Sequence, residues 1–195
     1  SDVCSSDFGV CLMAEPKLVA RCVQAMKQAC DLPVTVKHRI GIDRIEQYEF
    51  VRDFVAEVAN AGCDTFIVHA RNAWLRGLSP KENREVPPLR YEVVYRLKRE
   101  FPNLNIVLNG GVRDNAAIKA ALDHVDGAMV GREAYYNPYW LAEWDMAFLG
   151  VAASQQPTRD QVEEHMVDYM EQQWNQHRVP WHSIARHMLG LRRGM

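Results

Sequence analysis

The chain has 195 residues, of which 48% are hydrophobic and 25% are charged, and its formal net charge is −2. This composition is typical of a globular protein with one sizeable core. The near-neutral charge argues against a protein coated in basic residues, so any nucleic-acid surface must be local. No apolar run is long enough to span a membrane, and no basic stretch leads into an apolar one at the start. We therefore expect a cytoplasmic protein.

The cysteines are not spaced as C-x-x-C, and a disulfide framework is unexpected in a chain of this size. We expect free and mostly buried thiols, and we predict no metal site. The five residues concerned are Cys4, Cys11, Cys22, Cys30 and Cys63.

Residues 1–7 match no element and are treated as an unassigned leader. Helical and strand patterns then alternate along the chain, which predicts a parallel sheet with right-handed crossovers. Helices are expected over 16–30, from about 50 to 62, over 91–101 and after Asp114, and strands over 34–40, 64–70, 105–108 and 126–130. An eight-stranded barrel needs twice as many strands. We therefore interpret residues 8–150 as the carboxyl-terminal half of a (β/α)8 TIM barrel, and the chain as α/β.

No strand pattern follows residue 131, and residues 151–195 are expected to form part of an all-α helical domain. Thr158 and Gln161 are spaced as a capping box before a long helix, and a second helix is expected from Trp181 to Leu191. The last twenty residues contain no acidic side chain, so this basic and aromatic tail suits RNA contact. A solvated amphipathic bundle explains the same pattern almost as well.

Cationic and polar side chains stand at the ends of two consecutive predicted strands. Lys37 and Arg39 share one face of the first strand, and His69 is expected at the equivalent place on the next. Cations at the end of a buried strand are costly unless an anion or water faces them. A ligand site is therefore indicated, although a frayed strand end, or a structural histidine at 69, would give the same pattern.

Two glycine-containing stretches follow the last two predicted strands, Asn109-Gly110-Gly111 and Gly131-Arg132. Glycine lets backbone N–H groups approach an anion closely, and arginine adds a charged fork suited to phosphate. Two consecutive βα units that end in this way are typical of the phosphate site formed by the last strands of a (β/α)8 barrel.

The connection between residues 71 and 90 is longer than a typical βα loop, and its cations, Lys81 and Arg84 among them, outnumber its acids. A loop of this kind on the carboxyl face of a barrel favours ligand contact. A solvated surface loop is the alternative.

Five motifs stand in the chain in consistent order: V-T-V-K-H-R-I-G over 34–41, H-A-R over 69–71, L-S-P-K-E-N-R over 78–84, N-G-G over 109–111 and V-G-R-E-A over 130–134. Together they resemble the tRNA-dihydrouridine synthases. The K-E-N-R sequence and the Pro-Pro-Leu stretch after it resemble the A-type enzymes in particular. The resemblance extends from about Phe8 to Met195.

The resemblance implies an FMN-dependent enzyme that reduces uridine to 5,6-dihydrouridine in the D-loop of tRNA, with NADPH as hydride donor. It implies FMN contacts for Lys37 and His69, and FMN-phosphate contacts for Asn109, Gly110, Gly111, Gly131 and Arg132. It also implies substrate or tRNA contacts for Arg39, Lys81 and Arg84. tRNA is the one partner expected, with no protein partner and no membrane.

The family's general acid is a cysteine in an N-x-G-C-P-S-D-like stretch before the F-G-x-C-L-M segment, and this chain departs from that pattern. Cys4-Ser5-Ser6-Asp7 resembles it only faintly, and Cys11 matches a position that is not the acid. We assign no catalytic residue, and we expect a fragment that lacks the amino-terminal half of the barrel and is inactive alone. The alternatives are a flavin-dependent TIM-barrel oxidoreductase of a small molecule, and a non-catalytic RNA-binding remnant.

Overall fold

The structure is a computed structural model that describes residues 9–193. The leader expected at 1–7, with Cys4, lies outside the described residues. The chain divides into two compact units, the first ending at Met129 and the second beginning at Val130. The domain boundary predicted at residues 150 and 151 stays a prediction.

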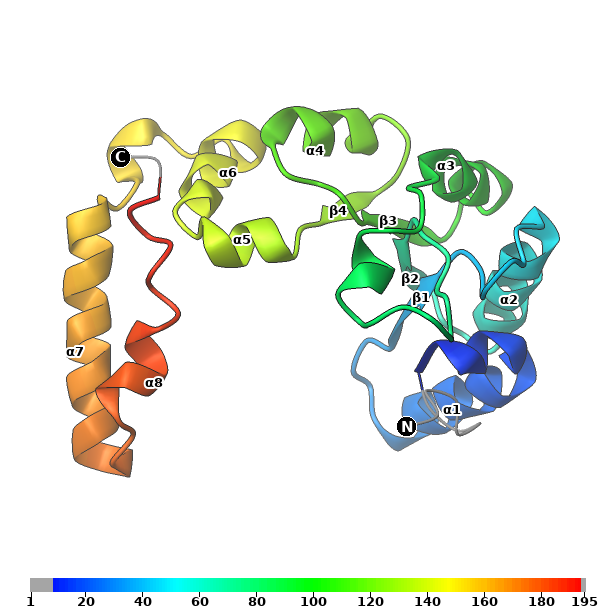
Figure 1. The fold of residues 1–195 in the computed structure, drawn as a ribbon, viewed down its shortest axis with the longest axis horizontal. Coiled ribbons are helices and arrows are strands. Elements are labelled where there is room, and N and C mark those ends of the chain that lie inside the picture. The colour runs from blue at the N-terminus through cyan, green and yellow to red at the C-terminus, as the bar shows by residue number, and fades with distance from the viewer. Residues whose placement is uncertain (1–8, 194–195) are drawn as a thin grey trace. The chain divides into compact units, whose positions relative to one another are not determined.

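The first unit alternates helices and strands (Figure 1). Its four strands pair in parallel in the order β1-β2-β3-β4, which confirms the predicted α/β organisation with a parallel sheet. The elements are the 3-10 helix η1 (Gly9–Ala14), α1 (Pro16–Ala29), β1 (Thr35–Arg39), α2 (Tyr48–Asn60), β2 (Thr65–His69), the 3-10 helix η2 (Glu82–Arg84), α3 (Tyr91–Glu100), β3 (Asn105–Asn109), α4 (Asn115–Leu122) and β4 (Gly127–Met129).

The two faces of the sheet differ in burial. Phe66, Val68, Ile106 and Leu108 point to one face and are almost completely buried. In Figure 1 the helices α1, α2 and α3 lie along one side of this sheet. The opposite face, which carries Lys37, is exposed or half-buried along β1 and β3. The core of the first unit therefore lies between the sheet and its helices.

The register brings the strand ends into line. Arg39 is paired with His69, and His69 is paired with Asn109. Asn109 is paired in turn with Met129 at the end of β4. Partners in a parallel register point to the same face, so the predicted common face of Lys37, Arg39 and His69 is confirmed.

The predicted helix ends are confirmed at two positions. The Asp114 side chain accepts a 2.7 Å hydrogen bond from the Ala117 N–H at the start of α4. Gly62 follows α2 with a φ of +97°, a left-handed conformation that glycine adopts without a steric cost. Both signals could be read from the chain because they depend on local chemistry.

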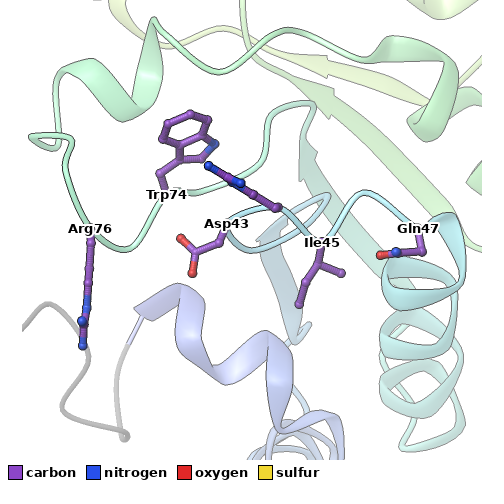
Figure 2. Close-up of a pocket in the computed structure, with 6 residues that line it drawn as sticks. Asp43, Ile45, Gln47, Trp74 and Arg76 are labelled. Carbon is purple, nitrogen blue, oxygen red and sulfur yellow. The ribbon is translucent and has the colours of Figure 1, made fainter.

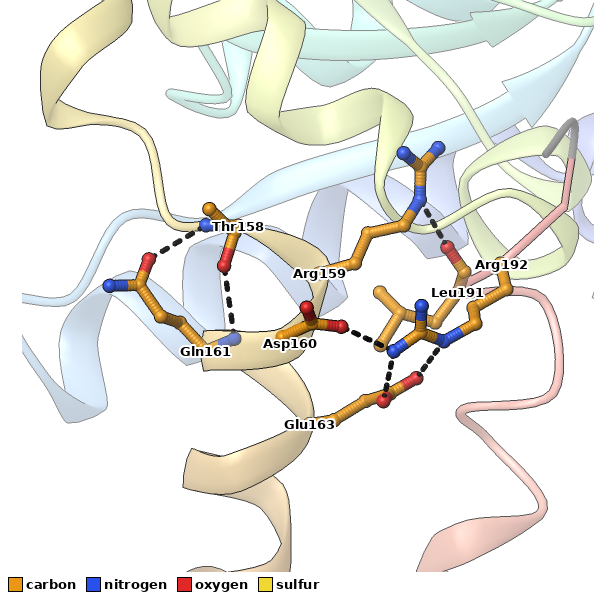
Figure 3. Close-up of polar contacts among 7 residues, drawn as sticks. All are labelled: Thr158, Arg159, Asp160, Gln161, Glu163, Leu191 and Arg192. Atoms are coloured by element: carbon orange, nitrogen blue, oxygen red, sulfur yellow. Dashed lines mark hydrogen bonds and ion pairs between the residues drawn. The ribbon is translucent and has the colours of Figure 1, made fainter.

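The described residues of the second unit form helices only. They are α5 (Arg132–Tyr136), α6 (Trp140–Leu149), the 3-10 helix η3 (Ala153–Gln155), α7 (Arg159–His177) and α8 (Trp181–Ala185). Figure 3 shows the capping box at the start of α7, where Thr158 Oγ1 accepts from the Gln161 N–H and the Gln161 side chain accepts from the Thr158 N–H. This cap confirms the sequence pattern.

The helix expected from Trp181 to Leu191 is shorter than predicted, because α8 ends at Ala185. The residues after it turn instead and are held by tertiary contacts (Figure 3). Arg192 pairs with Asp160 and Glu163, and Arg159 Nε donates to the Leu191 carbonyl. Backbone hydrogen bonds between residues three apart continue in these turns, as from the Met188 N–H to the Ala185 carbonyl and from the Leu191 N–H to the Met188 carbonyl.

The cysteine prediction was wrong in part. Cys63 is free and buried, and its thiol donates to the Val34 and Thr65 carbonyls. Cys22 and Cys30 are free but exposed, and Cys11 is disulfide-bonded. Among residues 9–193, no helix is both long and apolar enough to cross a membrane.

Candidate functional site

The carboxyl edge of the sheet gathers the predicted site residues that its strands carry. Arg39, His69 and Asn109 end three adjacent strands, and Lys37 lies two residues earlier on the same face of β1. His69 is only 9% exposed, whereas Lys37 is exposed. The sheet therefore supplies one edge that carries cations and a buried imidazole.

The cations at this edge repel one another. Burial, followed by the neighbouring charges of Arg71 and Arg84, lowers the pKa of Arg39 to about 10. Partial burial of the ammonium group, followed by the charge of Arg39, lowers the pKa of Lys37. In the described part of the chain, neither Lys37 nor Arg39 forms an ion pair with a carboxylate. An anion bound at this edge would relieve the repulsion.

Arg39 also holds the long connection between β2 and α3. Its guanidinium donates 3.0 Å to the carbonyl of Asn83 and 3.4 Å to that of Asn72. Both acceptors are neutral, so they leave the charge of Arg39 uncompensated. One side chain thus links the end of β1 to the loop that follows β2.

Gly110 and Gly111 have positive φ angles of 109° and 72° and lie against side chains of their own unit. A Cβ at Gly110 would lie 2.6 Å from His69 Cδ2, and one at Gly111 would lie 2.4 Å from Leu89 Cδ1. Tyr91 also donates a 2.7 Å hydrogen bond to the Gly110 carbonyl. Close packing and backbone conformation therefore require both glycines, whether or not a phosphate approaches them.

The Asn109 amide is engaged inside the sheet. Its Nδ2 donates 2.9 Å to the Met129 carbonyl at the end of β4. This bond fixes the side chain between two strand ends, and it leaves the amide oxygen as the acceptor that can face a ligand.

Gly131 and Arg132 belong to the second unit and are both exposed. Gly131 precedes α5 with a φ of −119°, and among the described residues beyond its two chain neighbours no atom lies within 4 Å of an ideal Cβ there. The protein's own packing therefore does not require glycine at this position, in contrast to Gly110. The open space suits the close approach of a ligand to the backbone.

Lys81 and Arg84 are exposed, Lys81 just before η2 and Arg84 at its end. Between them Asn83 points inward and fixes the loop. The Trp74 N–H donates 2.8 Å to Asn83 Oδ1, and Asn83 Nδ2 donates 2.8 Å to the Trp74 carbonyl. The short helix therefore presents its two cations outward from a loop with internal hydrogen bonds.

Three further residues shape this site and were not predicted from the sequence, namely Asn72, Asn83 and Tyr91. Asn83 belongs to the K-E-N-R motif, and nothing in the pattern separates it from its charged neighbours. Asn72 is 6% exposed and donates to the Asp43 and Ile45 carbonyls of the preceding loop. An uncharged polar residue shortly after a buried strand, beyond Ala70 and Arg71, was the signal that could have indicated it.

Comparison with known proteins identifies the family. The family model described as "Dihydrouridine synthase (Dus)" matches residues 1–195. The chain belongs to the dihydrouridine synthase family. The resemblance seen in the sequence motifs is thereby confirmed.

Relatives named "tRNA-dihydrouridine(20/20a) synthase" support the same family. The chain is 53% identical over 188 residues to one from Shewanella oneidensis, covering 96% of the chain and 56% of the relative. It is 52% identical to one from Vibrio cholerae, covering 96% of the chain and 57% of the relative. It is also 52% identical to one from Synechocystis, covering 97% of the chain and 56% of the relative. The chain thus spans little more than half the length of these relatives.

Proposed function

We propose that the protein containing this chain is an FMN-dependent tRNA-dihydrouridine synthase, which reduces uridine to 5,6-dihydrouridine in the D-loop of tRNA with NADPH as reductant. The observation that carries the proposal is the identity of about 52% to relatives named for this activity over 96% of the chain. A cytoplasmic location agrees with a tRNA substrate. The four-stranded unit is proposed as half of the (β/α)8 barrel, and residues 151–195 as part of a tRNA-binding helical domain.

The residues present fit an anionic cofactor. Lys37 and Arg39 lie at one strand end with pKa values lowered by burial and like charge, so a dianionic phosphate or a negatively charged ring would be stabilised beside them. We assign the FMN ring side to Lys37 and His69. We assign the phosphate to Asn109, Gly110 and Gly111 together with Gly131 and Arg132.

When bound, FMN supplies the reducing equivalents for the C5=C6 bond of uracil. The protein must hold that base and exclude water while a general acid delivers a proton to C5. Among the described residues we assign no such acid. Arg39 is proposed to contact the substrate at the mouth of the site.

The target base must leave its stack before it can reach the strand ends. Lys81 and Arg84 are proposed to bind the tRNA backbone while this occurs, because both are exposed beside a helix whose internal hydrogen bonds hold its shape. Phosphate contacts of this kind position the RNA without reading its sequence.

The test uses the full-length protein, purified with its flavin, and an unmodified tRNA transcript. Wild type is expected to be yellow and to form dihydrouridine with NADPH. Arg132→Ala removes a charge-assisted phosphate contact worth about 1.5–3 kcal/mol, so FMN should bind roughly 10- to 150-fold more weakly. Flavin absorbance after dialysis measures this loss.

Arg21→Ala, an exposed change on α1, is the matched control and should retain FMN. An Arg132→Ala variant that retains flavin as wild type does would remove Arg132 from the phosphate site. A colourless wild-type protein, or one that forms no dihydrouridine, would contradict the proposed function itself.

A further inference from the structure

A cavity of about 640 Å³ lies between the loops at the end of the sheet, and its described lining includes none of the proposed FMN residues. The loops that follow β1 and β2 form its walls, and Figure 2 shows five of its lining residues labelled. Among the described residues its lining consists of Asp43, Arg44, Ile45, Gln47, Trp74 and Arg76. Its volume falls within the usual range for small-ligand pockets.

Trp74 is the largest apolar side chain on this cavity and is 41% exposed. An indole combines a large apolar face with one polar N–H, so its exposed part is available for contact with a ligand. In Figure 2 the indole extends from its loop away from Arg76, with Asp43 and Ile45 on the facing loop. The ring is thus presented to solvent rather than packed into the core.

The backbone that carries Trp74 is held on both sides. Asn83 bonds its N–H and its carbonyl, each at 2.8 Å, and the preceding Ala73 pairs with Ile42 in a parallel bridge. The exposure of the indole is therefore built into the loop and does not result from fraying. A rigid aromatic platform binds with little loss of conformational entropy.

The opposite loop is held equally firmly. Asp43 has a φ of +50°, and its Oδ1 accepts a 2.8 Å hydrogen bond from the Leu75 N–H. Asn72 Nδ2 donates 3.2 Å to the Asp43 carbonyl and 3.0 Å to that of Ile45. These bonds join the two walls of the cavity across the end of the sheet.

The charges around Trp74 favour an anionic ligand. Arg44 and Arg76 line the cavity with Asp43, whose carboxylate already bonds the opposite loop. A smaller cavity that shares Asp43, Arg44 and Trp74 adds Arg90 and Glu46. An exposed indole flanked by guanidinium groups is the combination that binds single-stranded RNA, with a base on the ring and phosphates on the cations.

We propose that Trp74 is a stacking platform for one unpaired base of the substrate RNA, other than the reacting uracil, and that Arg44 and Arg76 bind the phosphates next to that base. This inference rests on the proposed function, because it takes tRNA as the ligand. Asn83 is a positioning residue for the platform. A base stacked here would hold the RNA beside the strand ends while the target base is unstacked.

The test compares Trp74→Ala, Trp74→Leu and Trp74→Phe in the full-length, FMN-loaded protein with an unmodified tRNA transcript. Loss of base stacking should weaken tRNA binding about 5- to 150-fold in the alanine and leucine variants. Phenylalanine keeps an aromatic face and should bind much closer to wild type. Leu32, which precedes β1, is an apolar residue that is 71% exposed, so Leu32→Ala is the control and should bind tRNA as wild type does.

Arg44→Gln and Arg76→Gln should each lower the slope of log Kd against log salt by about 1, as expected for the loss of one phosphate contact. Arg99→Gln, an exposed change on α3, should leave the slope unchanged. Slopes equal to wild type in both cavity variants would overturn the phosphate assignment.

Flavin content, measured for every variant, shows whether the fold is intact. If Trp74→Ala does not fold, a photo-crosslinking phenylalanine analogue at position 74 decides the question, because it should form a covalent adduct with the tRNA. An adduct with polypeptide alone, or Trp74→Leu binding tRNA as tightly as Trp74→Phe, would overturn the stacking site.

The two proposals fail in different ways. If wild type forms dihydrouridine while Trp74→Ala binds tRNA with unchanged affinity, the stacking site is overturned and the enzyme assignment stands. If wild type neither binds nor reduces the tRNA, both are overturned.

Discussion

Gly110 and Gly131 are both proposed to approach the FMN phosphate, yet their surroundings differ. Gly110 has a φ of +109° and would place a Cβ 2.6 Å from His69, whereas Gly131 has a φ of −119° and open space around it. Gly110→Ala should lower the free energy of unfolding by about 1–3 kcal/mol, because the backbone is strained and the imidazole must move. Urea unfolding measures the change.

Gly131→Ala is the matched comparison. It should leave the free energy of unfolding within about 0.5 kcal/mol of wild type, because nothing occupies the space of the new methyl group. If the phosphate site is correct, FMN retention should still fall, since the methyl group blocks the approach of the ligand. Equal stability losses in the two variants would contradict the packing described at Gly110.

At the scale of elements, the strands and most helices of the first unit could be predicted because their signals are local. Apolar runs ended by polar residues located the strands, and Asp114 and Gly62 marked helix ends. The loop over residues 71–90 could not be predicted, because Asn83 and Arg39 shape it across 44 positions of sequence. The predicted end of the last helix was also wrong. The chain turns after Ala185, and Arg192 forms ion pairs with residues of α7 that are distant in the sequence.

In the candidate site too, the features set by local pattern could be predicted, and the contacts between distant segments could not. The sequence indicated Lys37, Arg39 and His69 through the period of the strands, and the register confirms their common face. Nothing in the pattern indicated that Gly110 packs on His69, because that contact joins positions 69 and 110, which are 41 residues apart. Such contacts emerge only when the strands are paired.

The short helix η2 allows a prediction about RNA binding. Glu82 Oε2 accepts a 2.8 Å hydrogen bond from the Ser79 N–H, so the turn keeps its shape without help from Lys81 or Arg84. The double variant Lys81→Ala and Arg84→Ala should therefore fold normally but lower the salt slope of tRNA binding by about 2. Filter binding at several salt concentrations measures the slope.

The control replaces two exposed cations elsewhere on the first unit, Arg21→Ala with Lys119→Ala, which removes the same total charge. Its slope should stay close to that of wild type, because only local phosphate contacts release counterions. A double variant at 81 and 84 that behaved as this control does would exclude the loop from the RNA contact.

Burial of His38, the neighbour of Lys37 and Arg39, is expected to make the stability of the first unit depend on pH. Its ring lies 5.1 Å from that of Phe54 on α2 and 5.9 Å from that of Phe66 on β2. Burial lowers its pKa to about 4, the charge of Lys37 acts in the same direction, and the hydrogen bond of Nδ1 to the Arg39 carbonyl opposes both. The neutral imidazole of His38 therefore packs against Phe54 of α2 and Phe66 of β2.

Because the folded pKa is lower than the unfolded value of about 6.5, the unfolded chain binds a proton first as the pH falls. The contribution of His38 is fully present above pH 6.5 and is lost between about pH 6.5 and 4, with a total of roughly 3 kcal/mol. His38→Leu cannot take up that proton. The difference in unfolding free energy between wild type and His38→Leu should therefore shift by about this amount across the window, in favour of the variant at low pH.

Urea unfolding of the full-length protein at half-unit pH steps measures this difference. Subtracting the two curves removes the contributions of the other six histidines, which both proteins share. A difference that stays constant from pH 7 to pH 4 would mean that His38 takes up its proton at the same pH in the folded and the unfolded chain, which would contradict a pKa lowered by burial.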